Sequence, residues 1–539
     1  MSDHSSHTQF LPKESALDPR RWWTLAVLCL SLMIVSVGNS SLNVALPTLS
    51  EHLHASNSQL QWVVAAYSLV FAGLLFTAGA LGDRFGRKGA LQLGLMIFLF
   101  SASLASAATS VNQLIGYRAM MGAGAALIMP STLSILVNVF PPYERTKAIA
   151  IWAATAGGAG AIGPVASGFL LGHFWYGSVF LINVPIIALA LIAGHFLVPK
   201  SRDPEKAPLD PIGAVLSIVG IGSLVYGLIQ APEHGWSSGS TLGAFAFAIV
   251  VLAAFVAWEL RVEEPMLDMS LFRNPAFSAG SGGMILIFLA MFGVMFLITQ
   301  YFQLILGFSP LGASLRFLPM SPIMVIVATR TPRLAARFGA HRVVATGMSL
   351  VALALLMFRG LDTNTSYLYV FCCIAPLTTG IALAMSPMTT SIMSAVPARR
   401  AGTGSAMNDA TRELGAALGV AVLGSLAASR YGNLISGFGN AIPAESQAAV
   451  QSSLAGALDA AKTLPPTQAQ IVTSAAEHSF VSGIHFAVTV GAALAAIAAV
   501  VVYRYLPHIA THESTAESVE HMAELGVGGT LPVFQPDTM

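Results

Sequence analysis

The chain has 539 residues, of which 55% are hydrophobic and only 9% are charged, and its mean hydropathy is +0.72. Soluble domains carry about 25% charged residues, so this composition excludes an ordinary water-soluble protein. The formal net charge of +1 gives no sign of a nucleic-acid partner.

Long apolar segments follow one another along most of the chain. A helix that crosses a bilayer needs about 20 largely apolar residues, and fourteen segments meet this requirement. Lys13, Arg20 and Arg21 precede a first segment that is too long for a signal peptide, so we interpret it as an uncleaved span. The predicted spans are 22–45, 60–81, 89–108, 112–137, 146–171, 177–198, 211–230, 241–260, 277–306, 312–330, 342–359, 366–394, 403–428 and 482–505.

The positions of Lys and Arg predict the orientation. If the N-terminus is cytoplasmic, the outside segments hold only Arg359, Arg430 and Lys462. Arg118, Arg316 and Arg412 lie within spans, and the other basic residues fall at the inside. Because cytoplasmic loops carry an excess of Lys and Arg, we expect both termini in the cytoplasm of a cell whose inner membrane holds the protein.

Three segments are not expected to span the membrane. Residues 1–21 form a cytoplasmic N-terminal segment, and residues 506–539 form a polar tail without periodicity, for which we expect disorder. Residues 431–481 form a long extracytoplasmic loop rich in Ala, Ser, Gly and Gln. Within this loop, residues 444–461 are either a helix on the membrane face or a plain flexible loop.

An internal repeat divides the chain. The loop after the second span reads LGDRFGRK (81–88), and the loop after the tenth reads LAARFGAH (334–341). Such symmetry is typical of transporters whose two halves rock about a site at the midplane. We therefore predict an all-α membrane protein with a six-helix half at 22–198, a linker and an inserted helix pair at 199–260, and a second six-helix half at 261–505.

The LGDRFGRK loop carries a pattern that a merely basic loop does not explain. Its glycine allows a tight turn between two helices, its aspartate can accept hydrogen bonds from a helix N-terminus, and its arginines add charge pairing. Such a charged contact can hold one conformation closed. The predicted gating residues in this loop are Gly82, Asp83, Arg84, Gly86 and Arg87.

The fifth span reads GAGAIGPVASG and contains Gly160, Gly163 and Pro164. Small residues let helices approach closely, and a Gly-Pro step inside a span is expected to break the regular helix where bending is useful. We interpret this segment as part of a gate, although ordinary small-residue packing also explains the glycines.

Ionisable residues inside spans are candidates for coupling transport to protons. Arg118 lies near the start of the fourth span, and an intramembrane arginine usually faces the bundle interior or water. In the thirteenth span, Asp409 and Glu413 share one helix face with Arg412 beside them. A carboxylic acid in an apolar cavity binds a proton more readily than one in water, and Glu413 lies deeper in the span. The alternative interpretations are a buried structural pair or an interfacial snorkelling position for Arg118, and a solvated cluster for Asp409.

Several motifs together resemble one family. GALGDRFGRK resembles the signature loop of the major facilitator superfamily, and GAGAIGPVASG resembles the antiporter motif of its drug-exporting branches. LNVALP, YRAMMGAGAALIMPSTLS and FLINVPI are similar to further segments of the 14-span drug:proton antiporters of the QacA/EmrB group. This resemblance covers the chain up to about residue 505, and it implies coupling of proton or substrate through Arg118.

One departure from the family pattern concerns the first span. Family members often carry an aspartate before the NVALP stretch, but here the matching position is Gly38, followed by Asn39. No acidic residue lies in this span, so the usual proton site is absent. His485 in the last span is a further candidate, because histidine is a common proton-binding side chain, but we prefer to interpret it as a helix-packing histidine.

Polar side chains on apolar spans are candidates for substrate contacts. Tyr67, Gln300, Tyr301 and Gln303 are of this kind, and aromatic and amide groups in an apolar cavity suit amphipathic organic molecules. Cys29, Cys372 and Cys373 lie in apolar runs, so we expect neither disulfides nor a metal site.

We therefore expect a proton-driven exporter of hydrophobic or amphipathic small molecules. We expect neither enzymatic activity nor ATP coupling, since catalytic clusters and a nucleotide-binding loop are not recognisable in the sequence. No cofactor is expected beyond the proton-motive force, and the partners are protons, the lipid bilayer and the substrate, with a monomeric protein. Two alternatives remain: export of a lipid or endogenous metabolite, and proton symport into the cell on the same fold.

Overall fold

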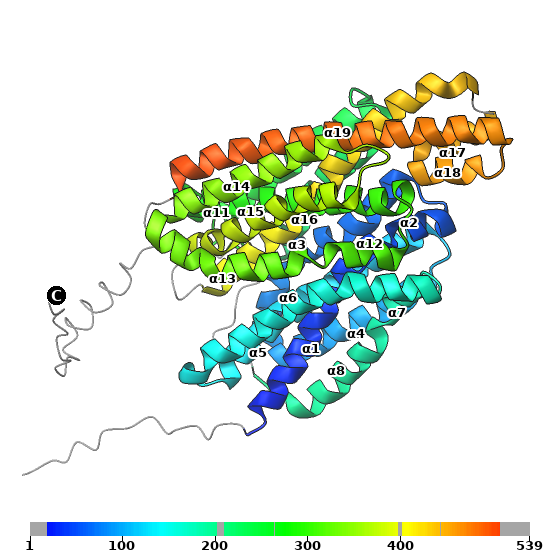
Figure 1. Cartoon of the computed structure of the whole chain (residues 1–539). Coiled ribbons are helices and arrows are strands. Elements are labelled where there is room, and N and C mark those ends of the chain that lie inside the picture. The colour runs from blue at the N-terminus through cyan, green and yellow to red at the C-terminus, as the bar shows by residue number, and fades with distance from the viewer. Residues whose placement is uncertain (1–18, 202–209, 264, 397–400, 442–443, 507–539) are drawn as a thin grey trace, which may run out of the picture.

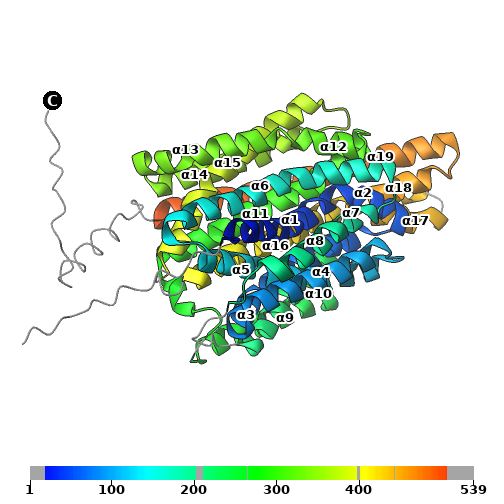
Figure 2. The same ribbon diagram turned by 90° about the horizontal axis from the view of Figure 1, so that it is seen from below.

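The computed structural model describes residues 19–201, 210–263, 265–396, 401–441 and 444–506, and helices make up almost all of them. The predicted disordered tail, apart from Leu506, and most of the predicted N-terminal segment lie outside the described residues. Figures 1 and 2 show long, roughly parallel helices arranged in two groups, with shorter helices at one end.

The first group, which we call the N-terminal bundle, contains eight helical segments. They are α1 (Arg21–Ser40), α2 (Leu42–Leu53), α3 (Asn57–Phe85), α4 (Arg87–Ser106), α5 (Val111–Val139), α6 (Pro142–His173), α7 (Ser178–Leu181) and α8 (Asn183–Leu197). Two further helices, the inserted pair, follow as α9 (Pro211–His234) and α10 (Gly239–Glu259).

The second group, the C-terminal bundle, follows the inserted pair. Its long helices are α11 (Pro275–Gln300), α13 (Met320–Phe338), α14 (Ala340–Met357), α15 (Tyr367–Ser394), α16 (Ala401–Ile435) and α19 (Pro466–Tyr505). Its short segments are η1 (Met269–Arg273), η2 (Tyr301–Ile305), α12 (Pro310–Phe317), η3 (Phe358–Gly360), η5 (Ser436–Ala441), α17 (Ala444–Ser452) and α18 (Leu454–Ala461).

The helices meet the length and composition of membrane spans. Thirteen of the helices in the described ranges are long and apolar enough to cross a bilayer. The continuous 32-residue helix α6 occupies the place of the predicted fifth span, and together they match the predicted order of fourteen. The chain is therefore a multi-pass membrane protein.

The two sequence repeats adopt the same local structure. Helix α3 ends at Phe85 and α4 begins at Arg87, with Gly86 between them at φ +119°. Helix α13 ends at Phe338 and α14 begins at Ala340, with Gly339 at φ +87°. Side chains rarely adopt such positive φ values, so glycine allows both helix pairs to reverse direction within one residue.

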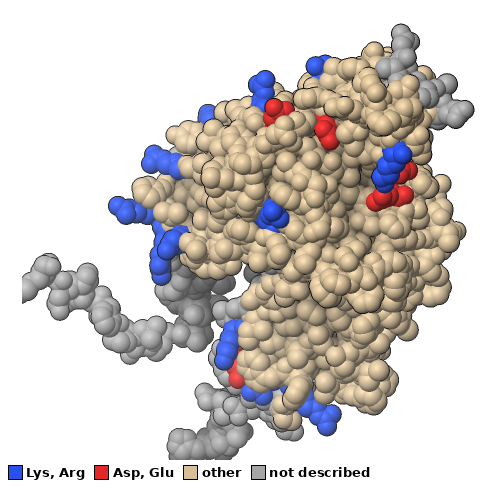
Figure 3. Space-filling view, turned by 45° about the vertical axis from the view of Figure 1, so that its right-hand side comes forward, with Lys and Arg blue, Asp and Glu red and all other residues tan. Residues whose placement is uncertain are grey.

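Contacts between the described parts of the two bundles run from one end of the molecule to the middle of α3 and α16. We call the end where α1 begins and α19 finishes the basal end, and the opposite end, which carries α17 and α18, the distal end (Figure 1). At the distal end α2 packs against α11, α12 and α18, and α12 packs against α6. In Figure 3 the surface is hollowed at the basal edge, between two groups of Lys and Arg side chains.

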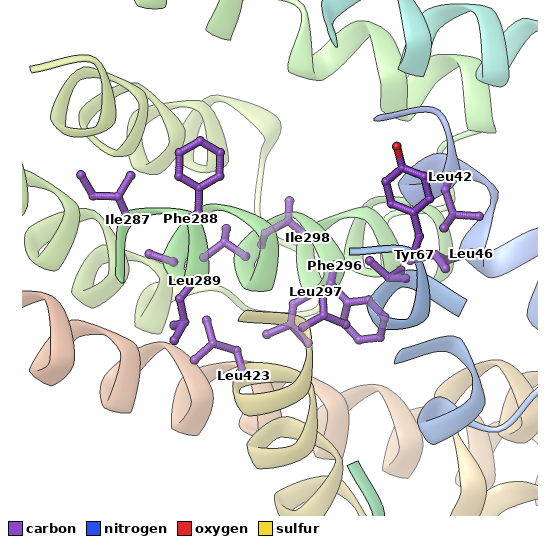
Figure 4. Close-up of a cluster of buried hydrophobic side chains, with 14 of the residues drawn as sticks. Leu42, Leu46, Tyr67, Ile287, Phe288, Leu289, Phe296, Leu297, Ile298 and Leu423 are labelled. Atoms are coloured by element: carbon purple, nitrogen blue, oxygen red, sulfur yellow. The ribbon is translucent and has the colours of Figure 1, made fainter. Parts of the chain in front are cut away.

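Hydrogen bonds between the described parts of the bundles lie on the distal side. Gln303 Nε2 donates to the Val44 carbonyl (2.9 Å), and the Ser425 hydroxyl donates to Gln61 Oε1 (3.1 Å). Figure 4 shows apolar side chains of α2 and α3 beside the distal end of α11. The structure is thus closed distally and recessed basally.

The inserted pair covers one seam between the bundles. Helix α9 packs against α3 of the N-terminal bundle, α16 of the C-terminal bundle and its own partner α10. A separate apolar cluster marks this three-way contact. Its buried members are Ala65, Val225, Ile229, Ala417 and Ala421.

Three predicted segments differ from the structure. The 431–481 region is not a flexible loop, because α16 continues to Ile435, α17 and α18 follow, and α19 begins at Pro466. The predicted tenth span is two helices, α12 and α13, whose second extends to Phe338. Helix α6 runs without interruption through Gly163 and Pro164, so the expected break in the fifth span is wrong.

The alanine-rich composition explains the first of these differences. The polar residues of this region end the hydrophobic signal in the sequence. The helices nevertheless continue, because alanine has the highest helix propensity. Tyr431 connects α16 to α17 and to the start of α18, because its hydroxyl donates to the carbonyls of Val450 (2.7 Å) and Ser453 (3.2 Å).

Candidate functional site

Arg118 is the largest fully buried side chain of the described residues, and it lies on α5. Its guanidinium donates from Nε to the Val63 carbonyl (3.1 Å) and from Nη1 to the Gly38 carbonyl (3.2 Å). These bonds join α5 to α3 and α1. The interfacial snorkelling position considered for this residue is therefore wrong, since its side chain is inaccessible to solvent.

Gly38 has a packing reason to lack a side chain. A Cβ at this position would lie 2.9 Å from the ring of Phe98 on α4. An aspartate here would require Phe98 to move, so the acid that the family pattern places at this position does not fit this packing. Instead, the Gly38 backbone carbonyl accepts a hydrogen bond from Arg118.

Tyr67 stacks on the same guanidinium. The Arg118 Cζ atom lies 4.3 Å from the centroid of the Tyr67 ring, which is a favourable cation–π distance. Tyr67 is fully buried, and its hydroxyl has no hydrogen-bond partner among the described residues. An unpartnered buried hydroxyl is costly, so this group is available to a ligand or water.

Glu413 brings a carboxyl group to this cluster from the other bundle. It lies on α16, one of the helices that pack against α3, and it interacts electrostatically with both Tyr67 and Arg118. Its Oε2 atom and the hydroxyl of Ser68 are buried close to each other, and neither makes a well-formed hydrogen bond to a described residue. We call Arg118, Tyr67, Ser68 and Glu413 the central cluster.

The central cluster has one property that ordinary buried polar groups lack. Each of its four members keeps at least one buried polar atom without a described partner, including Arg118 Nη2. Buried polar groups in folded proteins are almost always hydrogen-bonded. Such a concentration at the seam between two bundles suits a site that binds and releases protons, water or a polar part of a ligand.

Asp409 lies one turn closer than Glu413 to the basal end of α16, and Arg412 directly precedes Glu413. The Arg412 Nη1 atom is 3.9 Å from Asp409 Oδ1, and Asn408 Nδ2 donates to the same oxygen (3.4 Å). Arg412 also lies over the Phe288 ring at 5.7 Å. The predicted cluster on one helix face is therefore formed, with Asp409 paired and Glu413 left with a free oxygen.

Comparison with known proteins identifies the family. A model of the Major Facilitator Superfamily matches residues 28–420. The chain belongs to this superfamily.

Curated relatives of the superfamily align along most of the chain. The multidrug efflux pump LfrA of Mycolicibacterium smegmatis is 36% identical over 91% of this chain and 97% of its own length. The tetracenomycin C resistance and export protein of Streptomyces glaucescens is 34% identical over 90% of this chain and 92% of its own. The methyl viologen resistance protein SmvA of Salmonella typhimurium is 33% identical over 86% and 93%.

Solved structures agree on the fold. A bacterial homologue of the human lysosomal transporter Spinster, in an inward-facing and occupied conformation, matches with a TM-score of 0.63 at 17% identity. The match covers 90% of this chain and 98% of that one. The predicted all-α major facilitator architecture is confirmed.

The superfamily's signature loop adopts a compact turn. Arg87 Nε donates to Asp83 Oδ1 (2.7 Å), and the Arg87 amide donates to the Ser201 carbonyl (3.0 Å). Arg84 lies over the ring of the following Phe85. The expected tight turn at Gly86 is confirmed, but the described partner of Asp83 is an arginine side chain and not a helix N-terminus.

Glycines of the GAGAIGPVASG segment on α6 differ in their surroundings. A Cβ at Gly163 would lie 2.1 Å from the Ser40 hydroxyl of α1, and one at Gly168 would lie 2.7 Å from the Leu311 backbone of α12. At Gly160 nothing lies within 4 Å. Gly163 and Gly168 are thus points of close approach, whereas Gly160 lacks such a contact.

The other predicted substrate-contact residues lie toward the distal end. Gln303 Nε2 donates across the bundles to Val44, and Gln300 Nε2 donates to the Phe296 carbonyl of its own helix (3.1 Å). The Tyr301 hydroxyl donates to the Asp362 carbonyl. Their polar groups are engaged in the distal closure and in the C-terminal bundle, while Tyr67 belongs to the central cluster.

Two further residues are His485 on α19 and Ser68 on α3. His485 Nε2 lies 2.8 Å from the Leu361 carbonyl, which confirms the helix-packing interpretation. Ser68 is the member of the central cluster that sequence reasoning missed. The available signal was its hydroxyl on an apolar span, directly after Tyr67.

Proposed function

We propose that this protein exports hydrophobic or amphipathic small molecules across the cytoplasmic membrane in exchange for protons. The observation that carries the proposal is the central cluster, because it places a carboxyl group with a free oxygen and a buried cation on opposite bundles. The functions of the similar proteins, namely multidrug efflux, tetracenomycin C resistance and export, and methyl viologen resistance, support the substrate class.

Glu413 is the proposed proton carrier. When it is ionised, its charge is attracted to Arg118 across the seam, and when it is protonated that attraction is lost. A change of protonation therefore alters the energy of holding the two bundles together. Asp409, one turn nearer the basal recess, is proposed to pass protons between water and Glu413, with Arg412 stabilising its carboxylate, while Tyr67 contacts the substrate.

The bundles are proposed as the two moving halves. Residues 22–198 and 261–505 then rock against each other, with Gly163 of α6 and the signature loop around Asp83 as gating elements and 199–260 as an inserted segment. The basal end is cytoplasmic in this proposal, because basic residues collect there. The substrate enters through the basal recess and leaves after the distal contacts open.

The energy supply is sufficient without ATP. A membrane potential of 100 mV supplies about 2.3 kcal/mol per proton charge, and each pH unit adds about 1.4 kcal/mol. One proton therefore supports a concentration gradient of roughly tenfold to several hundredfold, depending on the two contributions.

The proposal is tested by efflux of a lipophilic cationic dye from proteoliposomes with an imposed proton gradient. We expect wild-type efflux that stops with a protonophore, at least a tenfold loss in Glu413→Gln, and a smaller loss in Asp409→Asn. Glu477→Gln on α19 is a matched control that removes an acid outside the central cluster.

Other outcomes are equally informative. Protonophore-resistant efflux in Glu413→Gln would remove proton exchange through this residue. Wild-type uptake down the proton gradient would indicate symport instead of export. Failure with dyes but transport of a labelled lipid would keep the mechanism and change the substrate class.

A further inference from the structure

A pair of buried carboxyl groups lies at the basal end of the inserted helices, on different elements from the central cluster. Asp210 precedes α9 and caps it, and Glu259 is the last residue of α10. They are only 7% and 3% exposed. Two acids buried together need a compensating charge or a proton.

The N–H groups around this pair leave one oxygen without a donor. The Gly213 amide and Trp258 Nε1 donate to Asp210 Oδ1 (2.8 and 2.9 Å), and Trp258 also reaches Oδ2 (3.1 Å). The Leu267 amide donates to Glu259 Oε2 (3.0 Å). Glu259 Oε1 is buried and has no hydrogen-bond partner among the described residues.

Gly213 shows where that oxygen is directed. A Cβ at Gly213 would lie 2.5 Å from Asp210 Oδ2 and 2.5 Å from Glu259 Oε1. Asp210 Oδ2 and Glu259 Oε1 therefore both border the position that a Gly213 Cβ would occupy. The distance between these two oxygens is at most twice 2.5 Å. Any larger residue would push into both carboxyl groups, so the glycine keeps open the space in which they meet.

No described basic side chain compensates this pair. Among the described titratable groups, Asp210 is the one that interacts with Glu259. The next charged residues along the chain, Arg261 and Glu263, are exposed. Helices α3 and α16, which pack on α9, contribute no titratable contact to Glu259.

We propose that Asp210 and Glu259 form a second proton-binding site, in which one proton lies between Glu259 Oε1 and Asp210 Oδ2. The proton comes from solvent and converts two repelling carboxylates into a hydrogen-bonded acid–carboxylate pair with a single negative charge. A divalent cation fits less well, because calcium and magnesium prefer six or more oxygen ligands and N–H groups already occupy three of the four carboxyl oxygens.

The site is connected to the bundles through the segment after α10. Glu259 holds the Leu267 amide, and the adjacent Met266 sulfur accepts a hydrogen bond from Thr77 of α3 (3.7 Å). Loss of the proton places two negative charges at the start of this segment. The inference goes beyond the proposed export function, because the inserted pair binds this proton whether or not Glu413 carries another.

Trp258 provides a direct optical test, since its indole N–H touches Asp210. The tryptophan emission of detergent-purified protein is titrated with pH, and the spectrum of Trp258→Phe is subtracted to isolate this residue. We expect one transition that fits a single proton, and its loss in Glu259→Gln and Asp210→Asn. Glu413→Gln should retain it, which separates this site from the central cluster.

Two further measurements exclude unfolding of the variants and an indirect change in tryptophan emission. Each variant is first shown to be folded by its thermal unfolding transition, and the infrared band of a protonated carboxylic acid is compared between wild type and Glu259→Gln. No transition in folded wild-type protein, or no difference in that band, would overturn the proposal. A transition that disappears with a chelator and returns with calcium would also overturn it, because the pair would then hold a cation.

Discussion

Arg118 illustrates how a single side chain organises the centre of the protein. Its guanidinium donates to the backbone of two neighbouring helices and stacks on Tyr67. No carboxylate is hydrogen-bonded to it among the described residues, and Glu413 of the opposite bundle supplies the facing negative charge. The cation is thus fixed by backbone carbonyls, while its electrostatic partner is free to change protonation.

Replacing Arg118 by lysine should be far from conservative. Lysine keeps the charge but lacks the planar fork that reaches Val63 and Gly38 together, so we expect a loss of about 1–3 kcal/mol in unfolding free energy and at least tenfold lower efflux. Thermal unfolding in detergent and dye efflux measure the two effects. Arg316→Lys, whose guanidinium bonds within its own helix, is the control, and equal effects in both variants would contradict this role.

The central residues were predictable only in part. Arg118 and Glu413 are apparent from the sequence, because charges are rare in apolar spans. Their juxtaposition was not, since it depends on how α5 and α16 each pack against α3. The role of Gly38 was also hidden, because its backbone carbonyl contacts Arg118 and only the position of Phe98 explains its missing side chain.

At the scale of helix packing, the close crossing of α3 and α5 determines the geometry of the central cluster. Helices α3 and α5 cross where Gly122 meets the backbone of Tyr67, and a Cβ at Gly122 would lie 2.4 Å from the Tyr67 carbonyl oxygen. This crossing positions Tyr67 of α3 against Arg118 of α5. The packing of two helices and the geometry of the site therefore depend on the same glycine.

Two glycine substitutions in α5 should have opposite effects. Gly122→Ala forces α3 and α5 apart, and we expect a loss of about 1–3 kcal/mol in unfolding free energy together with reduced transport. Gly116→Ala, which meets nothing within 4 Å, should instead stabilise the helix by about 0.5–1 kcal/mol. Thermal unfolding compares them, and a stable Gly122→Ala variant with normal efflux would show that the crossing is not tight.

Element boundaries show where hydropathy fails as a guide. The sequence located the apolar part of each span well, but α16 and α19 extend beyond it into polar residues. A helix ends where its backbone groups find other partners, and the hydrophobic pattern does not report those ends. The repeat around Gly86 and Gly339 was predictable because glycine marks the turn directly.

At the scale of the whole molecule, the distal end carries an ion pair between the bundles. Lys462 Nζ, directly after α18, lies 2.9 Å from Glu51 Oε1 on α2 and 3.3 Å from Asp459 Oδ1. These side chains are largely exposed, so the contribution is small, at most about 1 kcal/mol. It nevertheless acts directly on the balance between distally closed and open states.

Charge reversal of Lys462 should favour distal opening. Lys462→Glu is expected to raise, by up to about fivefold, the labelling rate of a cysteine placed at Ser40 by a membrane-impermeant thiol reagent, in a background without the three native cysteines. The double variant with Glu51→Lys should return the rate toward that of the starting protein. Unchanged labelling in Lys462→Glu would mean that this contact does not contribute to closure.

The same contact has a defined pH dependence. The carboxylates of Glu51 and Asp459 raise the pKa of Lys462. Its stabilisation is therefore complete below the usual lysine value of about 10.5 and is lost as pH rises through the raised pKa. Labelling of the Ser40→Cys variant should stay constant through neutral pH and increase only in strongly alkaline solution.

The inserted pair makes the two sides of the molecule unequal for a compound dissolved in lipid. On one side, α9 covers the seam between α3 and α16, and a layer of alanine, valine and isoleucine seals that contact. On the other side, where α12 packs on α6, α13 buries only Thr331 and Ala335 among its described residues. A lipophilic molecule diffusing in the plane of the bilayer is therefore blocked by α9 on one side of the protein and not by an inserted helix at α13 on the other. We expect such a molecule to approach the transporter from the side of α13.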